Sequence, residues 1–277
     1  MADVPIITLN DGNSIPQLGF GVWQVGNDEA VSVVGEAIRA GYRAIDTAQG
    51  YGNEEGVGKA IAASGLGRDE IFITSKLANS QHGYDKTLTA FMGTLGKLGV
   101  DWIDLFLIHW PVPARDKYAE TWKAFVQLQK DGRIKSIGVS NFLPEHLERI
   151  IGETGVTPAV NQIELHPEFQ QRDVREFHQQ SNIAIESYSP LGRGKLLGDT
   201  VIGEIARKHG KSPAQAILRW HLQEGLIVIP KSVTPQRIAE NFAVFDFELD
   251  SDDLKRIAGL DKTSGKMGSN PATMNNL

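Results

Sequence analysis

The chain has 277 residues, of which 41% are hydrophobic and 22% charged, and its formal net charge is −6. This composition is typical of a globular protein with a sizeable core, and the negative charge speaks against nucleic acid or an anionic membrane surface as a partner. Cysteine is absent, which excludes disulfides and a thiol nucleophile. No apolar run is long enough to span a bilayer and no signal-peptide pattern is present, so we expect a cytoplasmic protein.

The chain opens with two short apolar pieces around a turn signal at Asp11-Gly12, which predicts a β-hairpin ahead of the main fold. Strands and helices then alternate. The predicted strands cover residues 18–21, 43–46, 71–76, 103–109, 134–140, 159–162, 183–188 and 226–229. The predicted helices cover residues 28–40, 54–63, 85–98, 118–130, 144–151, 173–181, 200–209, 234–241 and 250–259, with one more beginning at Ser212-Pro213. The expected caps are Asn53, Asn141, Ser212 and Asp250.

About eight strand–helix units follow one another without a long linker, which predicts one domain over residues 1–277 with a polar tail at 262–277. Eight units at this length favour an α/β fold of the (β/α)8 TIM barrel type. A doubly wound open sheet is the alternative, because periodicity does not reveal closure. The glycines of 192–198 match a dinucleotide fingerprint only weakly, since Ser189-Pro190-Leu191 separates them from the preceding strand.

Asp46 ends the second predicted strand, and Tyr51 follows in the next turn. Alone, this pair fits a pinned turn as well as a functional site. Polar residues also end the other strands, and each has a plain explanation as a cap or a solvated strand end. In a barrel, however, these ends converge on the face where active sites lie. The residues are Lys76, His109, Ser140, Asn141, Gln162, Tyr188, Ser189, Lys231 and Ser232.

These residue types suit proton donation to a carbonyl oxygen. A free tyrosine is a weak acid with a pKa of about 10, and an ammonium group such as that of Lys76 should lower the pKa of Tyr51. Asp46 would keep Lys76 charged, and His109 would orient the substrate oxygen. Because no metal or flavin motif is present, nicotinamide is the natural source of hydride.

A second informative region brings Lys231, Ser232 and Arg237 to the start of a predicted helix. Exposed N–H groups at a helix start favour an anion, and arginine binds phosphate bidentately. Together with nicotinamide, this pattern predicts a site for the 2′-phosphate of NADPH.

Two other chemistries find less support. The seven histidines are scattered and no His-Glu-x-x-His pattern occurs, so we expect no metal. Glu164 and His166 could share a strand face, but a structural role is favoured. No Gly-x-Ser-x-Gly elbow of a serine hydrolase is present.

Several motifs lie at or after the predicted strand ends. They are Asp46-Thr-Ala-x-x-Tyr51-Gly-Asn-Glu54, Lys76, Leu107-Ile-His109-Trp-Pro111, Gly138-Val-Ser-Asn141, Asn161-Gln-Ile-Glu-Leu-His-Pro167 and Ile229-Pro-Lys-Ser232. Taken together, they resemble the motifs of the aldo-keto reductases, and the likeness runs nearly end to end. The sequence is most similar to those of bacterial 2,5-diketo-D-gluconate reductases. The resemblance implies a barrel, NADPH, and a catalytic tetrad on Asp46, Tyr51, Lys76 and His109.

The resemblance also implies three groups of cofactor-binding residues. Ser140, Asn141 and Gln162 would hold the carboxamide, with Tyr188 stacked on the nicotinamide. The pyrophosphate would be covered by Ser189, Leu191 and Gly192. The adenosine 2′-phosphate end would be held by Lys231, Ser232, Arg237, Glu240 and Asn241.

Relatives commonly carry a tryptophan where this chain has Ala78, which should open one wall of the substrate pocket. The predicted walls are Trp23, Ala78, Trp110 and Phe142, with His109 at the reacting oxygen. We therefore expect an NADPH-dependent, monomeric reductase of aldehydes, α-dicarbonyls or keto-sugars. The alternative is a nicotinamide-binding regulatory or structural protein on the same barrel, with little turnover.

Overall fold

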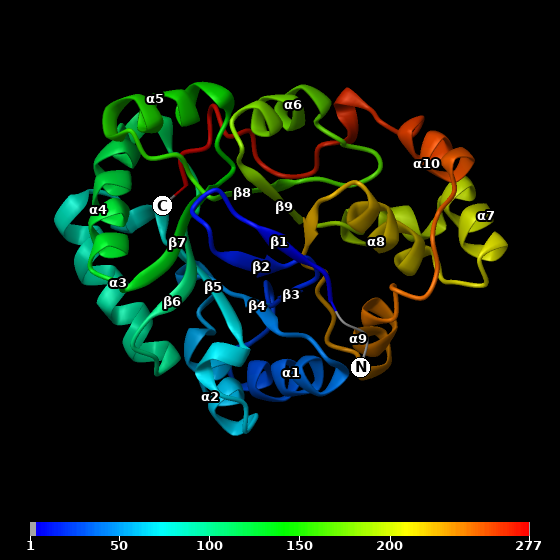
Figure 1. Ribbon diagram of the computed structural model, residues 1–277, viewed down its shortest axis with the longest axis horizontal. Helices are drawn as coiled ribbons and strands as arrows, with labels where there is room; N and C mark the ends of the chain where they lie inside the picture. The colour runs from blue at the N-terminus through cyan, green and yellow to red at the C-terminus, as the bar shows by residue number, and fades with distance from the viewer. Residues whose placement is uncertain (1–3, 277) are drawn as a thin grey trace.

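The computed structural model describes residues 4–276, and a ring of helices surrounds a central sheet (Figure 1). The predicted hairpin is confirmed: β1 (Ile6–Thr8) pairs antiparallel with β2 (Ser14–Pro16). It lies over the amino ends of the barrel strands, because the amide of Asn13 donates to the carbonyl of Lys135 near the start of a strand. The hairpin therefore closes the end of the barrel opposite the strand carboxyl ends.

Eight parallel strands follow, and each pairs with the next along the chain. The ring is closed by the backbone: Gly19 N donates to Val228 O at 2.9 Å, and Val228 N donates to Gln17 O at 2.9 Å. This closure confirms the (β/α)8 barrel and excludes the open sheet. The strands are β3 (Phe20–Gly21), β4 (Ala44–Asp46), β5 (Phe72–Leu77), β6 (Ile103–Ile108), β7 (Ile134–Ser140), β8 (Val160–Glu164), β9 (Ala184–Tyr188) and β10 (Ile227–Val228).

Helices cover the outside of the sheet (Figure 1). None of those within residues 4–276 has the length and apolar character needed to cross a bilayer. They are α1 (Asn27–Ala40), α2 (Glu54–Ala63), α3 (Tyr84–Leu98), α4 (Tyr118–Lys130), α5 (Pro144–Thr154), α6 (Arg172–Gln180), α7 (Thr200–Lys208), α8 (Pro213–Gln223), α9 (Pro235–Phe242) and α10 (Ser251–Ala258).

The predicted helix caps are only partly confirmed. Ser212 and Asp250 accept backbone N–H bonds at the starts of α8 and α10. Asn53 stands before α2 but does not cap it; its amide donates to the carbonyls of Val22 and Val25, and its oxygen accepts from Thr47. The side chain of Asn53 thus ties two loops together at the carboxyl end of the barrel.

The prediction that Asn141 caps a helix is wrong. Helix α5 begins at Pro144, and Leu143 occupies the capping position. The backbone of Asn141 is left-handed, with φ of 61°, a conformation that asparagine tolerates better than most residues. The turn directs the Asn141 side chain toward the barrel mouth instead.

An ion cluster holds one strand at the opposite end of the barrel. The guanidinium of Arg68 and the ammonium of Lys135 each lie 3.6 Å from the ring centroid of Trp102, so they occupy its two faces. Asp104, near the start of β6, accepts from Arg68 at 2.7 Å and from the N–H of Ile73 at 2.9 Å. The cluster joins β5 and β6 far from their carboxyl ends.

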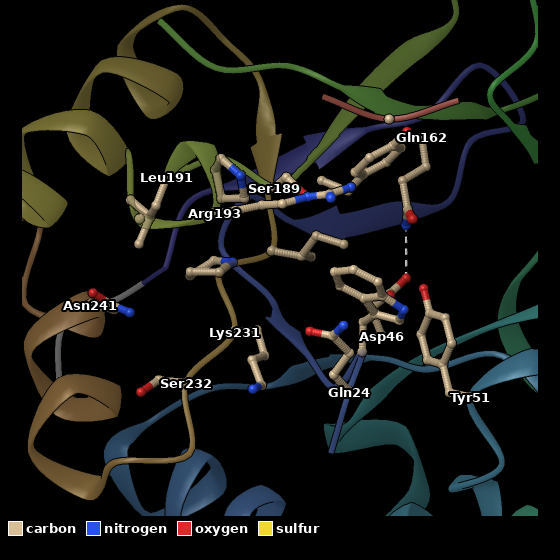
Figure 2. A pocket seen from close by; sticks show the side chains of 18 of the residues that line it. Gln24, Asp46, Tyr51, Gln162, Ser189, Leu191, Arg193, Lys231, Ser232 and Asn241 are labelled. Atoms are coloured by element: carbon tan, nitrogen blue, oxygen red, sulfur yellow. Dashed lines mark hydrogen bonds between the residues drawn. The ribbon is translucent and has the colours of Figure 1, made fainter. Parts of the chain in front are cut away.

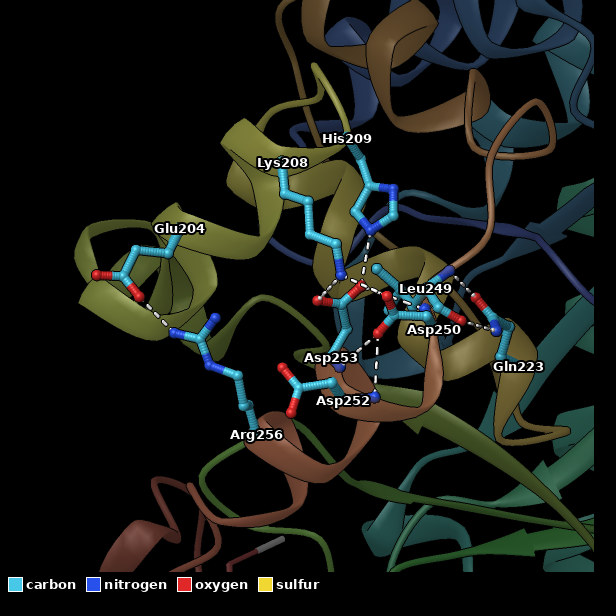
Figure 3. A network of polar contacts seen from close by, with 9 residues as sticks. All are labelled: Glu204, Lys208, His209, Gln223, Leu249, Asp250, Asp252, Asp253 and Arg256. Atoms are coloured by element: carbon cyan, nitrogen blue, oxygen red, sulfur yellow. Dashed lines mark hydrogen bonds and ion pairs between the residues drawn. The ribbon is translucent and has the colours of Figure 1, made fainter.

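Helix α10 is fastened to the end of α7 by a network of polar contacts (Figure 3). The buried carboxylate of Asp253 lies 2.9 Å from Lys208 Nζ and 2.7 Å from His209 Nε2. Burial opposes ionisation, but the contacts with His209 and Lys208 outweigh it and lower the pKa of Asp253. The C-terminal tail leaves directly from this fixed helix.

Replacing Asp253 by Asn should lower the free energy of unfolding by about 1–3 kcal/mol at neutral pH, because a buried charged acceptor is lost. A depressed pKa in the folded state contributes stability that is present above the unfolded value of about 3.9 and lost as the pH falls further. The difference in the free energy of unfolding between the wild type and Asp253→Asn should therefore become smaller in acid. Urea denaturation across a pH series measures it. Asp252→Asn, on an exposed residue of the same turn, is the control; equal losses in both variants would contradict the assignment.

Candidate active site

A cavity of about 1230 Å³ opens at the carboxyl ends of the strands. Asp46, Tyr51 and Gln162 lie at one side of it, and Lys231, Ser232 and Asn241 lie at the other (Figure 2). It exceeds the roughly 300–1,000 Å³ of a typical small-molecule pocket. The lining residues that the sequence predicted are Trp23, Asp46, Tyr51, His109, Trp110, Ser140, Asn141, Gln162, Tyr188, Ser189, Leu191, Lys231, Ser232, Arg237, Glu240 and Asn241.

Four predicted site residues do not line this cavity. Lys76 lies beneath its floor, fully buried. Neither Ala78 nor Gly192 is among its lining residues: the N–H of Ala78 donates to the side chain of Gln49 at 2.8 Å, and Gly192 packs against Leu196. The prediction of Phe142 as a substrate wall is wrong: the ring is buried against Tyr118, because the left-handed turn at the preceding residue carries it into the helix layer.

Lys76 is the centre of the predicted tetrad. Its ammonium group donates to Asp46 Oδ1 at 2.6 Å, to the carbonyl of Thr47 at 3.0 Å and to the hydroxyl of Tyr51 at 3.3 Å. Burial disfavours the charged ammonium, but Asp46 and Tyr51 outweigh this effect and raise the pKa of Lys76. Lys76 therefore carries its charge at neutral pH, directed at the phenol oxygen.

The expected lowering of the tyrosine pKa is only one of two opposing effects. Burial raises the pKa of Tyr51, Lys76 lowers it, and the balance lies above the ordinary value. The expectation of a net lowering is therefore wrong for the protein alone. Tyr51 holds its proton at neutral pH, and Lys76 stands where it stabilises a phenolate once that proton leaves. This arrangement suits a proton donor.

His109 follows β6, and its ring meets that of Tyr51 edge-on, with 5.7 Å between centroids. Burial and the charge of Lys76, with a smaller effect of His82, lower the pKa of His109 to about 3. The imidazole is therefore neutral at physiological pH, with one N–H to donate. A neutral donor can orient an oxygen without competing with Tyr51 as an acid.

Hydrogen bonds join the ends of β6 to β9. The Asn141 amide donates to the carbonyl of His109 at 3.1 Å, and its oxygen accepts from the Tyr188 hydroxyl at 2.8 Å. The Ser140 hydroxyl donates to the carbonyl of Gln162 at 2.8 Å. The four residues predicted to hold a nicotinamide ring thus form one connected wall of the cavity.

The other end of the cavity is built around the start of α9. Lys231 and Arg237 are exposed cations there, Ser232 is nearly buried, and the helix presents its first N–H groups. The Ser232 hydroxyl accepts from the N–H of Thr234 at 3.2 Å. The predicted phosphate-binding residues are therefore gathered at one helix N-terminus, which favours an anion.

The entry of the C-terminal tail into the site was not predicted. The buried Glu164 carboxylate accepts the N–H groups of Met267 and Gly268, each at 2.7 Å, and one of its oxygens lies 3.2 Å from the His166 ring. A side chain at Gly268 would place its Cβ 2.7 Å from this carboxylate, so a larger residue there would displace the anchor. The Glu164 carboxylate thus anchors the tail.

Beyond this anchor the tail crosses the mouth of the cavity. The carbonyl of Asn276 accepts from the Asn79 amide at 2.8 Å, on the loop after β5. Tail residues thus form a wall that the sequence did not predict. Those that line the cavity are Gly268, Ser269, Met274 and Asn276.

A second unpredicted feature lies inside the barrel. The amide nitrogen of Gln162 donates to Asp46 Oδ2 at 2.8 Å and to Glu186 Oε2 at 2.6 Å. Glu186 is almost fully buried on β9. Alternation along the strand would have marked it as inward-facing, but an acidic residue in a buried strand carries no recognisable motif.

Known proteins resemble this chain over nearly its whole length. Residues 17–262 match the aldo/keto reductase family. An aldo-keto reductase of Mycolicibacterium smegmatis is 57% identical over 271 residues, and methylglyoxal reductase DkgA of Escherichia coli is 53% identical over 273; each match covers 98% of both chains. A crystal structure of a Gox0644 mutant in complex with NADPH has a TM-score of 0.96 at 54% identity, covering 99% of both chains.

The chain therefore belongs to the aldo/keto reductase family. The predicted resemblance is confirmed, and with it an enzyme of the oxidoreductase class.

Replacing Glu164 by Gln should release the tail, because an amide offers one acceptor oxygen where the carboxylate offers two. Loss of a hydrogen bond to a charged group corresponds to about 10–100-fold faster amide exchange at Met267 and Gly268. Hydrogen–deuterium exchange measures it directly. Glu168→Gln, which removes only the exposed ion pair with Lys262, should leave both amides protected; unchanged exchange in Glu164→Gln would show that the tail is held by other contacts.

Proposed function

We propose that this enzyme reduces the carbonyl group of small aldehydes and α-dicarbonyls to an alcohol, with NADPH as cofactor and Tyr51 as proton donor. The observation that carries the proposal is the buried ammonium of Lys76, shared between Asp46 and the Tyr51 hydroxyl. The complex of NADPH with Gox0644, a protein of the same fold and 54% sequence identity, supports the cofactor. When bound, NADPH supplies the hydride.

The chain's own residues handle the proton. As charge develops on the carbonyl oxygen, the Tyr51 hydroxyl transfers its proton to that oxygen and becomes a phenolate beside Lys76. Asp46 holds the ammonium in place, so the phenolate meets a charge that is already oriented. The neutral His109 ring donates its N–H to the same oxygen and fixes the carbonyl for attack. A proton from solvent then restores Tyr51.

The two ends of the cavity fit the two ends of the cofactor. Ser140, Asn141 and Gln162 hold the carboxamide of the nicotinamide, and Tyr188 stacks on its ring. Ser189 and Leu191 cover the pyrophosphate, and Gly192 closes the turn that carries them, because its N–H donates to the carbonyl of Ser189 at 2.9 Å. Arg237 and Lys231 pair with the 2′-phosphate at the start of α9, where Ser232, Glu240 and Asn241 complete the site.

The substrate occupies the mouth between Trp23, Trp110 and the tail residue Met274. These walls are mainly apolar and aromatic, which suits a compact carbonyl compound. The relation to methylglyoxal reductase DkgA, at 53% identity, favours α-dicarbonyls, and keto-sugars are the second candidate. The monomeric state and the cytoplasmic location stay predictions, which size-exclusion chromatography and cell fractionation would test.

Replacing Tyr51 by Phe should lower kcat about 10²–10⁴-fold with NADPH and methylglyoxal, because the donated proton is lost while the ring remains. The Kd of NADPH should change little, since the cofactor wall is intact. Steady-state kinetics and a fluorescence titration of NADPH separate the two effects. A kcat close to that of the wild type would refute the role of Tyr51.

Replacing Arg237 by Ala should raise the KM for NADPH about tenfold, because a charge-assisted phosphate contact is lost. The KM for NADH, which lacks this phosphate, should stay within about twofold. Kinetics with both cofactors make the comparison, and Gln236→Ala, on an exposed neighbour outside the cavity lining, is the control. Equal effects on the two cofactors would rule out the phosphate assignment.

A further inference from the structure

We propose that Glu186 is a positioning residue that fixes the orientation of the Gln162 amide and, through it, the carboxamide of the bound nicotinamide. The proton transfer described above does not use Glu186. This inference rests on the proposed function, since it concerns how that cofactor is held.

The register of the sheet brings the Gln162 and Glu186 side chains together. Gln162 of β8 and Glu186 of β9 are directly paired in the parallel register, so their side chains leave the sheet on the same, inner side. Both are almost fully buried. Asp46 reaches the same point from β4, across the interior of the barrel, and the Gln162 amide lies between the two carboxyl groups.

An amide nitrogen carries two hydrogens, and here both are used. One is donated to Asp46 Oδ2 at 2.8 Å and the other to Glu186 Oε2 at 2.6 Å. A flipped Gln162 would turn its oxygen toward the Asp46 carboxylate, which already accepts from Lys76 and cannot donate in return. Asp46 therefore selects this orientation of the amide, and Glu186 holds the second amide hydrogen through Oε2.

The orientation of the Gln162 amide decides which of its atoms faces the cavity. Gln162 lines the cavity, and its oxygen makes no hydrogen bond to any residue between 4 and 276. An amide oxygen only accepts, so it binds a carboxamide through the NH₂ group and not through the C=O. The carboxamide is thereby fixed, and the ring face turned toward the substrate is fixed with it.

Glu186 also has a defined charge state. Burial raises its pKa to about 8, and the neighbouring carboxylate of Asp46 adds to the effect. The charged or titratable groups that act on it are Asp46, Lys76 and Tyr51. At neutral pH Glu186 is mostly protonated and still offers a carbonyl oxygen to Gln162. Above pH 8 it ionises, and the added negative charge makes Tyr51 a weaker acid.

A double-mutant cycle on the full-length enzyme tests whether Glu186 acts through Gln162. Glu186→Leu and Gln162→Ala should each raise the Kd of NADPH about tenfold, and the double variant should be no worse than either single one. Tryptophan fluorescence titration gives the Kd values. Ser187→Ala, the next residue on β9 with its side chain on the opposite face, is the control for local packing. Effects that multiply in the double variant would overturn the proposal.

The conservative variant Glu186→Gln keeps an acceptor but cannot ionise. It should keep the Kd of NADPH within about threefold of the wild type and abolish the fall in kcat that ionisation of Glu186 produces above pH 8. A Kd as poor as that of Glu186→Leu, or an unchanged pH profile, would overturn the proposal. If the wild-type enzyme itself neither bound NADPH nor reduced methylglyoxal, the proposed function would fail instead, so the two failures are distinguishable.

Discussion

The buried contact between Lys76 and Asp46 is the interaction on which the site depends. An ammonium with no solvent exposure is costly unless it is paired and its hydrogens are satisfied. Here one carboxylate, one backbone carbonyl and one phenol surround it. The chain can meet this demand only if β4, β5 and the turn after β4 are all in register. The need to pair the buried ammonium of Lys76 therefore also places the Tyr51 hydroxyl beside a positive charge.

Asp46 extends this constraint to the cofactor wall. Its first oxygen pairs with Lys76, and its second accepts from Gln162. The proton donor and the surface predicted to hold nicotinamide thus share one carboxylate. Any shift of the strand that carries Asp46 would disturb both at once, which gives a physical reason for tying both functions to the end of a strand.

Much of this arrangement was predictable because barrel strands end in polar residues and the helices between them have clear periodicity. Lys76 and His109 could be grouped with Tyr51 because two of them end predicted strands and the third lies in the turn after another. Closure of the sheet could not be predicted from the sequence. It rests on backbone hydrogen bonds such as that between Gly19 and Val228, which lie about 210 positions apart. Phe142 was misplaced because a single left-handed residue redirects the chain after β7. Two other contacts were not predicted for the same reason. The binding of the tail by Glu164 and the contact of Glu186 with Gln162 join residues that no local sequence pattern marks as partners.

The ring of Trp102, held between Arg68 and Lys135, has a consequence for how the protein can change. It stands just before β6, and His109 stands just after it, so one strand of about 20 Å separates the ion cluster from the reacting end. Substitutions that reshape the substrate walls leave this cluster untouched. The cluster thus stabilises the barrel at a distance from the active site. Laboratory evolution of new substrate preferences can therefore accumulate destabilising substitutions in the substrate walls before the protein unfolds.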